Sequence, residues 1–272
     1  MIDSGDPLVA DLLAGTIDLI REAGGYVAPS TLIIERAGQL SITSSVLDGE
    51  TLLRIPRAAF VRVDRVTFSL DQDHIVIAQV PEDCGELEWE LLYLQVALHN
   101  GCNKLAWMRR THPSLDPSFP GDLIEAVRLV VPSFRSPRME PVDLLWANRC
   151  FRIPMTHQAA PERVLIPLVD LLNHHAKGAV GDWDGEAFEV SARLPFGTAQ
   201  CALDYGMDRD PLEMAIVYGF FDPSTGITDG RGYDIDALKR IIALASTADA
   251  PESAEPLRGS AARIVRELES RA

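Results

Sequence analysis

Cysteine is scarce in this sequence, and the few cysteines are scattered. Cys84, Cys102, Cys150 and Cys201 include no pair at the close spacing that zinc sites use. We therefore expect reduced, mostly buried thiols and no metal site.

Long apolar runs are absent as well. No stretch reaches the roughly 18 consecutive apolar residues that indicate a membrane-spanning helix, so no span is predicted. The acidic N-terminal segment, residues 1–13, has no basic region before its apolar residues, and we expect no secretory signal. These features predict a cytoplasmic protein with no membrane partner.

Positive charge is also in short supply. Lys and Arg number 25 against 40 Asp and Glu, which gives a formal net charge of −15. Since nucleic-acid affinity comes largely from Lys and Arg side chains that neutralise phosphates, we expect no nucleic-acid partner. A basic substrate would instead be attracted. The apolar fraction of 47% excludes wholesale disorder and predicts a full core.

Hydrophobic periodicity and turn residues predict short strands and amphipathic helices. Asp6 and Pro7 are typical of an N-cap and first helical position, and Gly24 of a helix end. A polar link at Thr247–Pro256 is expected to be flexible. The other expected helices are Leu87–Asn100, Asp122–Val131, Val142–Ile153, one from the capping box at Asp210 to Gly219, Ile235–Ser246 and Ala261–Ser270. The expected strands are Leu32–Ile34, Leu40–Thr43, Thr51–Ile55, Arg65–Leu70, Ala187–Leu194 and Gln200–Tyr205.

The expected strands fall into two blocks with a mainly helical stretch between them. This layout lacks the regular strand–helix alternation of a doubly wound sheet and predicts an α+β fold with an insertion. The expected domains are an N-terminal helix at 1–24, two halves of one domain at 25–71 and 163–225, a helical insertion at 72–162 and a short helical tail at 226–272.

Four segments, taken in order, carry the most specific information. They are Asp48-Gly-Glu-Thr-Leu-Leu-Arg-Ile-Pro56, Trp146-Ala-Asn-Arg-Cys-Phe151, Arg163-Val-Leu-Ile-Pro-Leu-Val-Asp-Leu-Leu-Asn-His-His175, and the pair Tyr205 and Tyr218 before Gly-Phe220. Together they resemble the motifs of SET-domain protein-lysine methyltransferases. The chain looks like a divergent, bacterial-type short form of the branch that contains the Rubisco large-subunit methyltransferase. The resemblance implies a SET-domain fold of short β-sheets with a knot-like core, interrupted by a helical insertion.

The resemblance also implies a cofactor and a set of site residues. S-adenosylmethionine would donate a methyl group to a lysine amine of a protein substrate, and no metal would take part. Tyr218 would be the catalytic tyrosine and Tyr205 would line the lysine channel. Asn173 and His174 would hold the adenine, and Arg149 would contact the methionine end of the cofactor.

The sequence departs from the family pattern in its early glycine-rich loop. The two glycines of a G-x-G motif fall near Ala37 and Gln39, and Gly38 remains as the one glycine for a cofactor contact. The tail at 226–272 is also short. Two alternatives therefore stay open: a SET-fold binding module without activity, and a SET-fold enzyme acting on a small-molecule amine. Taken alone, Tyr205 and Tyr218 would be half-buried core aromatics.

Overall fold

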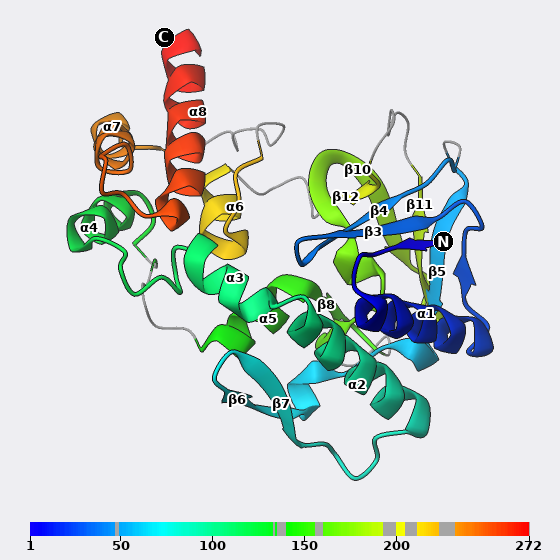
Figure 1. Ribbon diagram of the computed structural model, residues 1–272. Coiled ribbons are helices and arrows are strands. Elements are labelled where there is room, and N and C mark those ends of the chain that lie inside the picture. Colours follow the sequence, from blue (N-terminus) through cyan, green and yellow to red (C-terminus); the bar gives the residue numbers. More distant parts are fainter. Residues whose placement is uncertain are drawn as a thin grey trace. The chain divides into compact units, whose positions relative to one another are not determined.

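Figure 1 shows the computed structural model, which describes residues 1–46, 49–132, 134, 140–155, 160–192, 200–204, 211–222 and 232–271. The chain has the predicted α+β class, with several short sheets. It forms two compact units. Unit 1 contains residues 1–105 and 145–205, and unit 2 contains residues 106–144 and 206–272.

All strands of the described residues lie in unit 1. The largest sheet has five strands in the order β12-β10-β11-β5-β2, and a three-stranded sheet has the order β1-β3-β4. Strands β6 and β7 form one hairpin pair, and β8 and β9 form another. The strands are β1 (Ile2–Asp3), β2 (Tyr26–Val27), β3 (Leu32–Arg36), β4 (Gln39–Thr43), β5 (Thr51–Pro56), β6 (Thr67–Asp71), β7 (His74–Gln79), β8 (Cys150–Ile153), β9 (Glu162–Leu165), β10 (Asn173–Trp183), β11 (Ala187–Ser191) and β12 (Ala202–Leu203).

The first two helices confirm the sequence reading. In α1, the Asp6 carboxylate accepts a hydrogen bond from the backbone N–H of Leu8 at 2.9 Å, with proline at the first helical position. Helix α2 packs against α1, where Gly15 allows a close approach to Leu94. The helices are α1 (Pro7–Glu22), α2 (Glu86–Gly101), α3 (Lys104–Thr111), α4 (Gly121–Val130), α5 (Pro141–Arg149), α6 (Pro211–Tyr218), α7 (Ile235–Leu244) and α8 (Glu255–Arg271). Short 3₁₀ turns are η1 (Arg57–Ala59), η2 (Val63–Arg65), η3 (Val169–Leu171) and η4 (Glu252–Ala254).

The predicted helix Val142–Ile153 is wrong in its last turn. Helix α5 ends at Arg149, and the next residues form β8, in which Phe151 pairs with Val164 of β9. Helical spacing of apolar residues cannot distinguish a helix end from a short strand when a partner strand, distant in sequence, decides the conformation. Residues 72–105, assigned by sequence to the insertion, lie in unit 1. The predicted domain boundaries stay a prediction.

Unit 2 is helical in its described residues. One core joins α4, α6, α7 and α8, with Leu212, Leu238 and Leu257 fully buried (Figure 1). The segment Thr247–Pro256, expected to be flexible, instead contains η4 and the start of α8. It is held because the buried Ser253 hydroxyl donates to the Asp116 carboxylate at 2.6 Å.

Candidate functional site

The segment expected to form the cofactor loop is the turn of the β3–β4 hairpin. The register pairs Arg36 with Gln39. Ala37 and Gly38 therefore form a two-residue turn, with φ of 52° and 76°. Positive φ at both positions is the geometry of a type I′ turn. A Cβ on Gly38 would lie 2.5 Å from the Cys102 carbonyl oxygen, so this close backbone approach requires glycine. The cofactor role of Gly38 stays a prediction.

Arg149, the last residue of α5, lies beside the segment that leads into Asn173. Its Nη1 donates to the carbonyl oxygen of Asp170 in η3 at 2.7 Å. The pairing of β8 with β9 joins the same two stretches of chain. The motif segments 146–151 and 163–175, found separately in the sequence, therefore meet in unit 1.

A buried polar cluster lies next to this contact. His99, Lys104 and Asp170 are all buried, and His99 Nε2 lies 3.8 Å from Asp170 Oδ2. Neither carboxylate oxygen of Asp170 has a hydrogen-bond partner within the described residues. Lys104 Nζ donates to the Gln39 side-chain oxygen at 3.0 Å. The cluster thus connects the hairpin turn with the Arg149 contact.

Burial shifts the pKa values of this cluster strongly. Loss of hydration raises the pKa of Asp170 to about 7, against an opposing effect of Arg149. Burial, assisted by the positive charge of Arg149, lowers the pKa of Lys104 to about 7. The pKa of His99 is held well below its usual value, chiefly by burial. Two cations that repel each other, with one buried carboxylate, favour an anionic group nearby.

The predicted adenine-binding pair begins β10. The Asn173 side chain is exposed and makes no hydrogen bond with another described residue, whereas His174 is half-buried. Asn173 pairs with Ala202 of the parallel strand β12, and the register then breaks between His174 and Ala179. Figure 1 shows the curl of β10 at this break. The exposed amide edge of Asn173 can hydrogen-bond a heterocycle.

Tyr218 belongs to unit 2, where it is the last residue of α6. It is half-buried, and its ring centroid lies 6.0 Å from that of Phe220. Tyr205 lies outside the described residues. Gly38, Arg149, Asn173 and His174 belong to unit 1, so the structure describes them separately from Tyr218.

A buried histidine fixes the backbone on both sides of Tyr218. The His112 Nδ1 accepts from the Ser114 N–H at 3.1 Å, so Nε2 carries the proton and donates to the Val217 carbonyl, also at 3.1 Å. A Cβ on Gly219, which has φ of 72°, would lie 2.7 Å from the His112 ring. Burial lowers the pKa of His112 to about 4, which keeps the ring neutral.

The sequence reading missed four residues of these two arrangements: His99, Lys104, His112 and Asp170. Asp170 carries one available signal, a lone carboxylate within the apolar run around Leu171. Such a group is rarely buried without a role. The other three give no signal in local sequence, because their burial depends on contacts with distant segments.

The described residues contain no group of three or more His, Cys, Asp or Glu side chains placed to hold a metal ion. All four cysteines are free thiols. Burial raises the pKa of Cys102 to about 11 and that of Cys150 well above its usual value, which disfavours the thiolate. Within the described part of the chain, no helix is long and apolar enough to cross a membrane.

Comparison with known proteins gives a distant structural similarity. No family model and no curated protein matches the chain. Among solved structures, the chain is similar to the crystal structure of the SET domain of LSMT bound to lysine and AdoHcy, at a TM-score of 0.41 and 14% identity. The match covers 80% of this chain and 58% of that one. At this identity the similarity concerns the fold alone.

Proposed function

We propose that the protein is a SET-domain methyltransferase that transfers a methyl group from S-adenosylmethionine to a lysine amine of a protein substrate. The observation that carries the proposal is the contact of Arg149 with the Asp170 carbonyl. It joins the motif segments 146–151 and 163–175, which carry the resemblance to the family. It also places a guanidinium beside the turn that leads into Asn173.

The residues of unit 1 fit the charged and polar ends of this cofactor. Arg149 uses one guanidinium nitrogen on Asp170, and its other donors make no further hydrogen bond with described residues. The positive charge of Arg149 suits the carboxylate at the methionine end. The exposed amide of Asn173 suits the adenine edge. When bound, S-adenosylmethionine supplies a methyl group already activated on a sulfonium.

The proposed role of the protein is to align the acceptor and to keep it neutral. A lysine amine has a pKa of about 10.4 in water, so an apolar channel must disfavour its ammonium form. With the cofactor held by Arg149 and Asn173, its sulfonium would supply the methyl group to this neutral nitrogen, the thioether would be the leaving group, and the proton would pass to water. The Tyr218 hydroxyl would orient this amine at a reactive distance of roughly 3–3.5 Å.

Transfer of tritium from methyl-labelled cofactor to proteins of a cell lysate tests the proposal. The wild type should label a protein on lysine, and Tyr218→Phe should reduce the rate at least about tenfold, because alignment is lost. Tyr26→Phe, at an exposed tyrosine of β2, is the matched control and should label as the wild type does. Equal labelling by wild type and Tyr218→Phe would refute the role of Tyr218.

A second candidate is a SET-fold binding module without catalysis. The observation that favours it is the hairpin turn at Ala37 and Gly38, where the glycine faces the Cys102 carbonyl. Calorimetry with S-adenosylhomocysteine separates the candidates. Micromolar binding supports the enzyme, whereas no binding together with no labelling supports the module. Labelling of a small amine alone would instead indicate a small-molecule acceptor.

A further inference from the structure

The outward face of α2 carries an unusual set of side chains. Glu86, Trp89, Glu90 and Tyr93 are all exposed and follow the i, i+3, i+4, i+7 spacing of one helix face. Trp89 is 40% exposed and Tyr93 58%. An outward helix face is normally polar, whereas Trp and Tyr are concentrated where one protein binds another. We call these four residues the acidic-aromatic face.

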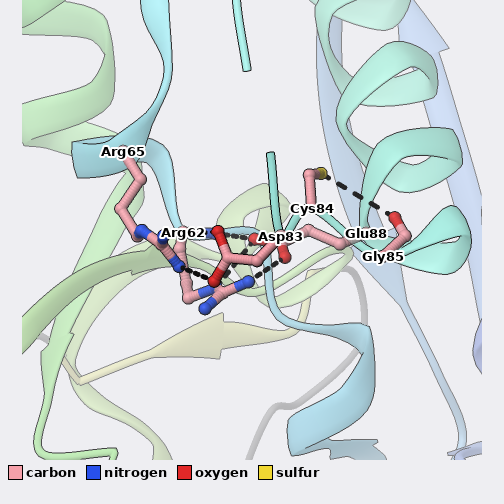
Figure 2. Close-up of polar contacts among 6 residues, drawn as sticks. All are labelled: Arg62, Arg65, Asp83, Cys84, Gly85 and Glu88. Carbon is pink, nitrogen blue, oxygen red and sulfur yellow. Dashed lines mark hydrogen bonds and ion pairs between the residues drawn. The ribbon is translucent and has the colours of Figure 1, made fainter. Parts of the chain in front are cut away.

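Charge on this face is not balanced within the described residues. Glu86 and Glu90 form no ion pair there, and the rings of Trp89 and Tyr93 form no ring contact. Glu88, on the same helix, behaves differently. Figure 2 shows Glu88 at the start of α2, next to Arg62. The backbone N–H and the Nε of Arg62 donate to the Glu88 carboxylate at 2.9 and 3.0 Å.

A surface hollow of about 580 Å³ adjoins this face at the start of α2. Glu86 lines it, so the hollow and the face are continuous. Phe60, Leu87 and Met155 give it apolar lining, and Glu88 and Glu186 bring its carboxylates to three. Arg62, also in the lining, is paired with Glu88, and Arg57 offsets one of the two other carboxylates, so the lining keeps a small net negative charge.

The spacing of the face suits an extended chain. Trp89 and Tyr93 are four residues apart, as are Glu86 and Glu90, and four residues of helix rise about 6 Å. Alternate side chains of an extended segment lie roughly 6.6 Å apart on one side. Successive cationic side chains of such a segment can therefore each meet one ring and one carboxylate, combining cation–π and ionic attraction.

We propose that the acidic-aromatic face binds an extended segment of a partner protein with Lys or Arg at alternate positions. Charge complementarity selects this occupant, since unpaired carboxylates repel phosphates and anionic surfaces and an apolar partner would leave them desolvated. The inference is independent of methyl transfer, because binding here needs no cofactor.

Fluorescence anisotropy with a short labelled peptide, lysine alternating with serine, tests the proposal. Glu86→Gln with Glu90→Gln should weaken binding about fivefold to twentyfold, and Trp89→Ala about threefold to tenfold, from the known strengths of ion pairs and cation–π contacts. The double variant should also lose most of the salt dependence between about 0.05 M and about 0.3 M salt.

The matched controls carry the same changes elsewhere. Asp249→Asn with Glu252→Gln removes two exposed charges of unit 2, and Tyr26→Ala removes an exposed ring of β2. Both should bind the peptide as the wild type does. Equal weakening by the charge control would show attraction by the net charge alone and overturn the site. Wild-type binding by the face variants would overturn it as well. Self-association abolished by Trp89→Ala would make a second copy the occupant.

Discussion

At the residue scale, the buried cluster of unit 1 is costly to fold. Asp170 has no hydrogen-bond partner for its carboxylate within the described residues, and Lys104 is buried beside another cation. Leu168, two residues before Asp170, has φ of 68° without being glycine. Backbone strain together with shifted pKa values is typical of sites that bind ligands. The cost of this cluster makes it a candidate ligand-binding site.

Asp170→Asn should remove a pH-dependent component of stability. The folded pKa of about 7 lies above the ordinary 3.8, so the folded state holds the proton more tightly. The contribution of the protonated Asp170 to the stability of the folded wild type is fully present below about pH 4 and is lost as the pH rises through about 7. In denaturant titrations, the free energy of unfolding of the variant should rise relative to that of the wild type, by roughly 1–3 kcal/mol between about pH 5 and about pH 8. Parallel pH curves for the two proteins would contradict this.

His112→Phe should destabilise unit 2 and remove a second pH dependence. The pKa of His112 is lowered from 6.5 to about 4, so the wild type loses stability as the pH falls through this window. The ring of phenylalanine preserves the packing but leaves the Ser114 N–H and the Val217 carbonyl without their partner. We expect the variant to have a free energy of unfolding about 2–4 kcal/mol below that of the wild type near neutral pH. This difference should become smaller toward about pH 4. A loss that stays constant across this range would contradict the neutral histidine.

The sequence predicted the residues of the motif but not those that surround it. Arg149 and Asn173 were found from residue order, and the structure brings Arg149 to the segment before Asn173. Lys104 and His99 could not be found this way, since their burial results from tertiary packing around α2. Whether the motif residues bind the cofactor stays a prediction.

At the element scale, local signals were reliable where capping and periodicity agree. Helix α1 begins after Asp6 as expected, and α6 ends before Gly219, which has the positive φ of a helix terminus. The strand β8 at Cys150–Ile153 was missed because its partner β9 decides its conformation. The β3–β4 register sets the turn at Ala37 and Gly38, and the cofactor role of Gly38 stays a prediction.

Gly38→Ala tests how tightly this turn packs. The new Cβ would lie 2.5 Å from the Cys102 carbonyl and would also meet the cost of a φ of 76°. Gly24→Ala is the matched control, because its φ is 83° and nothing lies within 4 Å of its Cβ. Thermal unfolding should show that the free energy of unfolding falls by about 1 kcal/mol in the control and by about 2–4 kcal/mol in Gly38→Ala. Equal losses would show that strain alone requires the glycine.

At the scale of the whole molecule, each unit is assembled from two stretches of chain that are far apart in sequence. Unit 2 combines residues 106–144 with residues 206–272. Composition and periodicity predicted its helices, but not that the tail would share a core with α4. That pairing depends on which apolar faces fit together, and every amphipathic helix of the chain offers such a face.

Asp116→Ala should loosen both stretches of unit 2 together. Its carboxylate accepts from Ser253 Oγ at 2.6 Å and from the Ser118 N–H at 2.8 Å, so it ties residues 106–144 to the segment before α8. Removing it leaves a buried hydroxyl unpaired, at a cost of about 2–4 kcal/mol. Hydrogen exchange should accelerate in α4 and α8, and remain as in the wild type in α1 and β5, because a unit with its own core opens by itself. Acceleration of equal size in α1 and β5 would mean that the two units unfold as one cooperative structure.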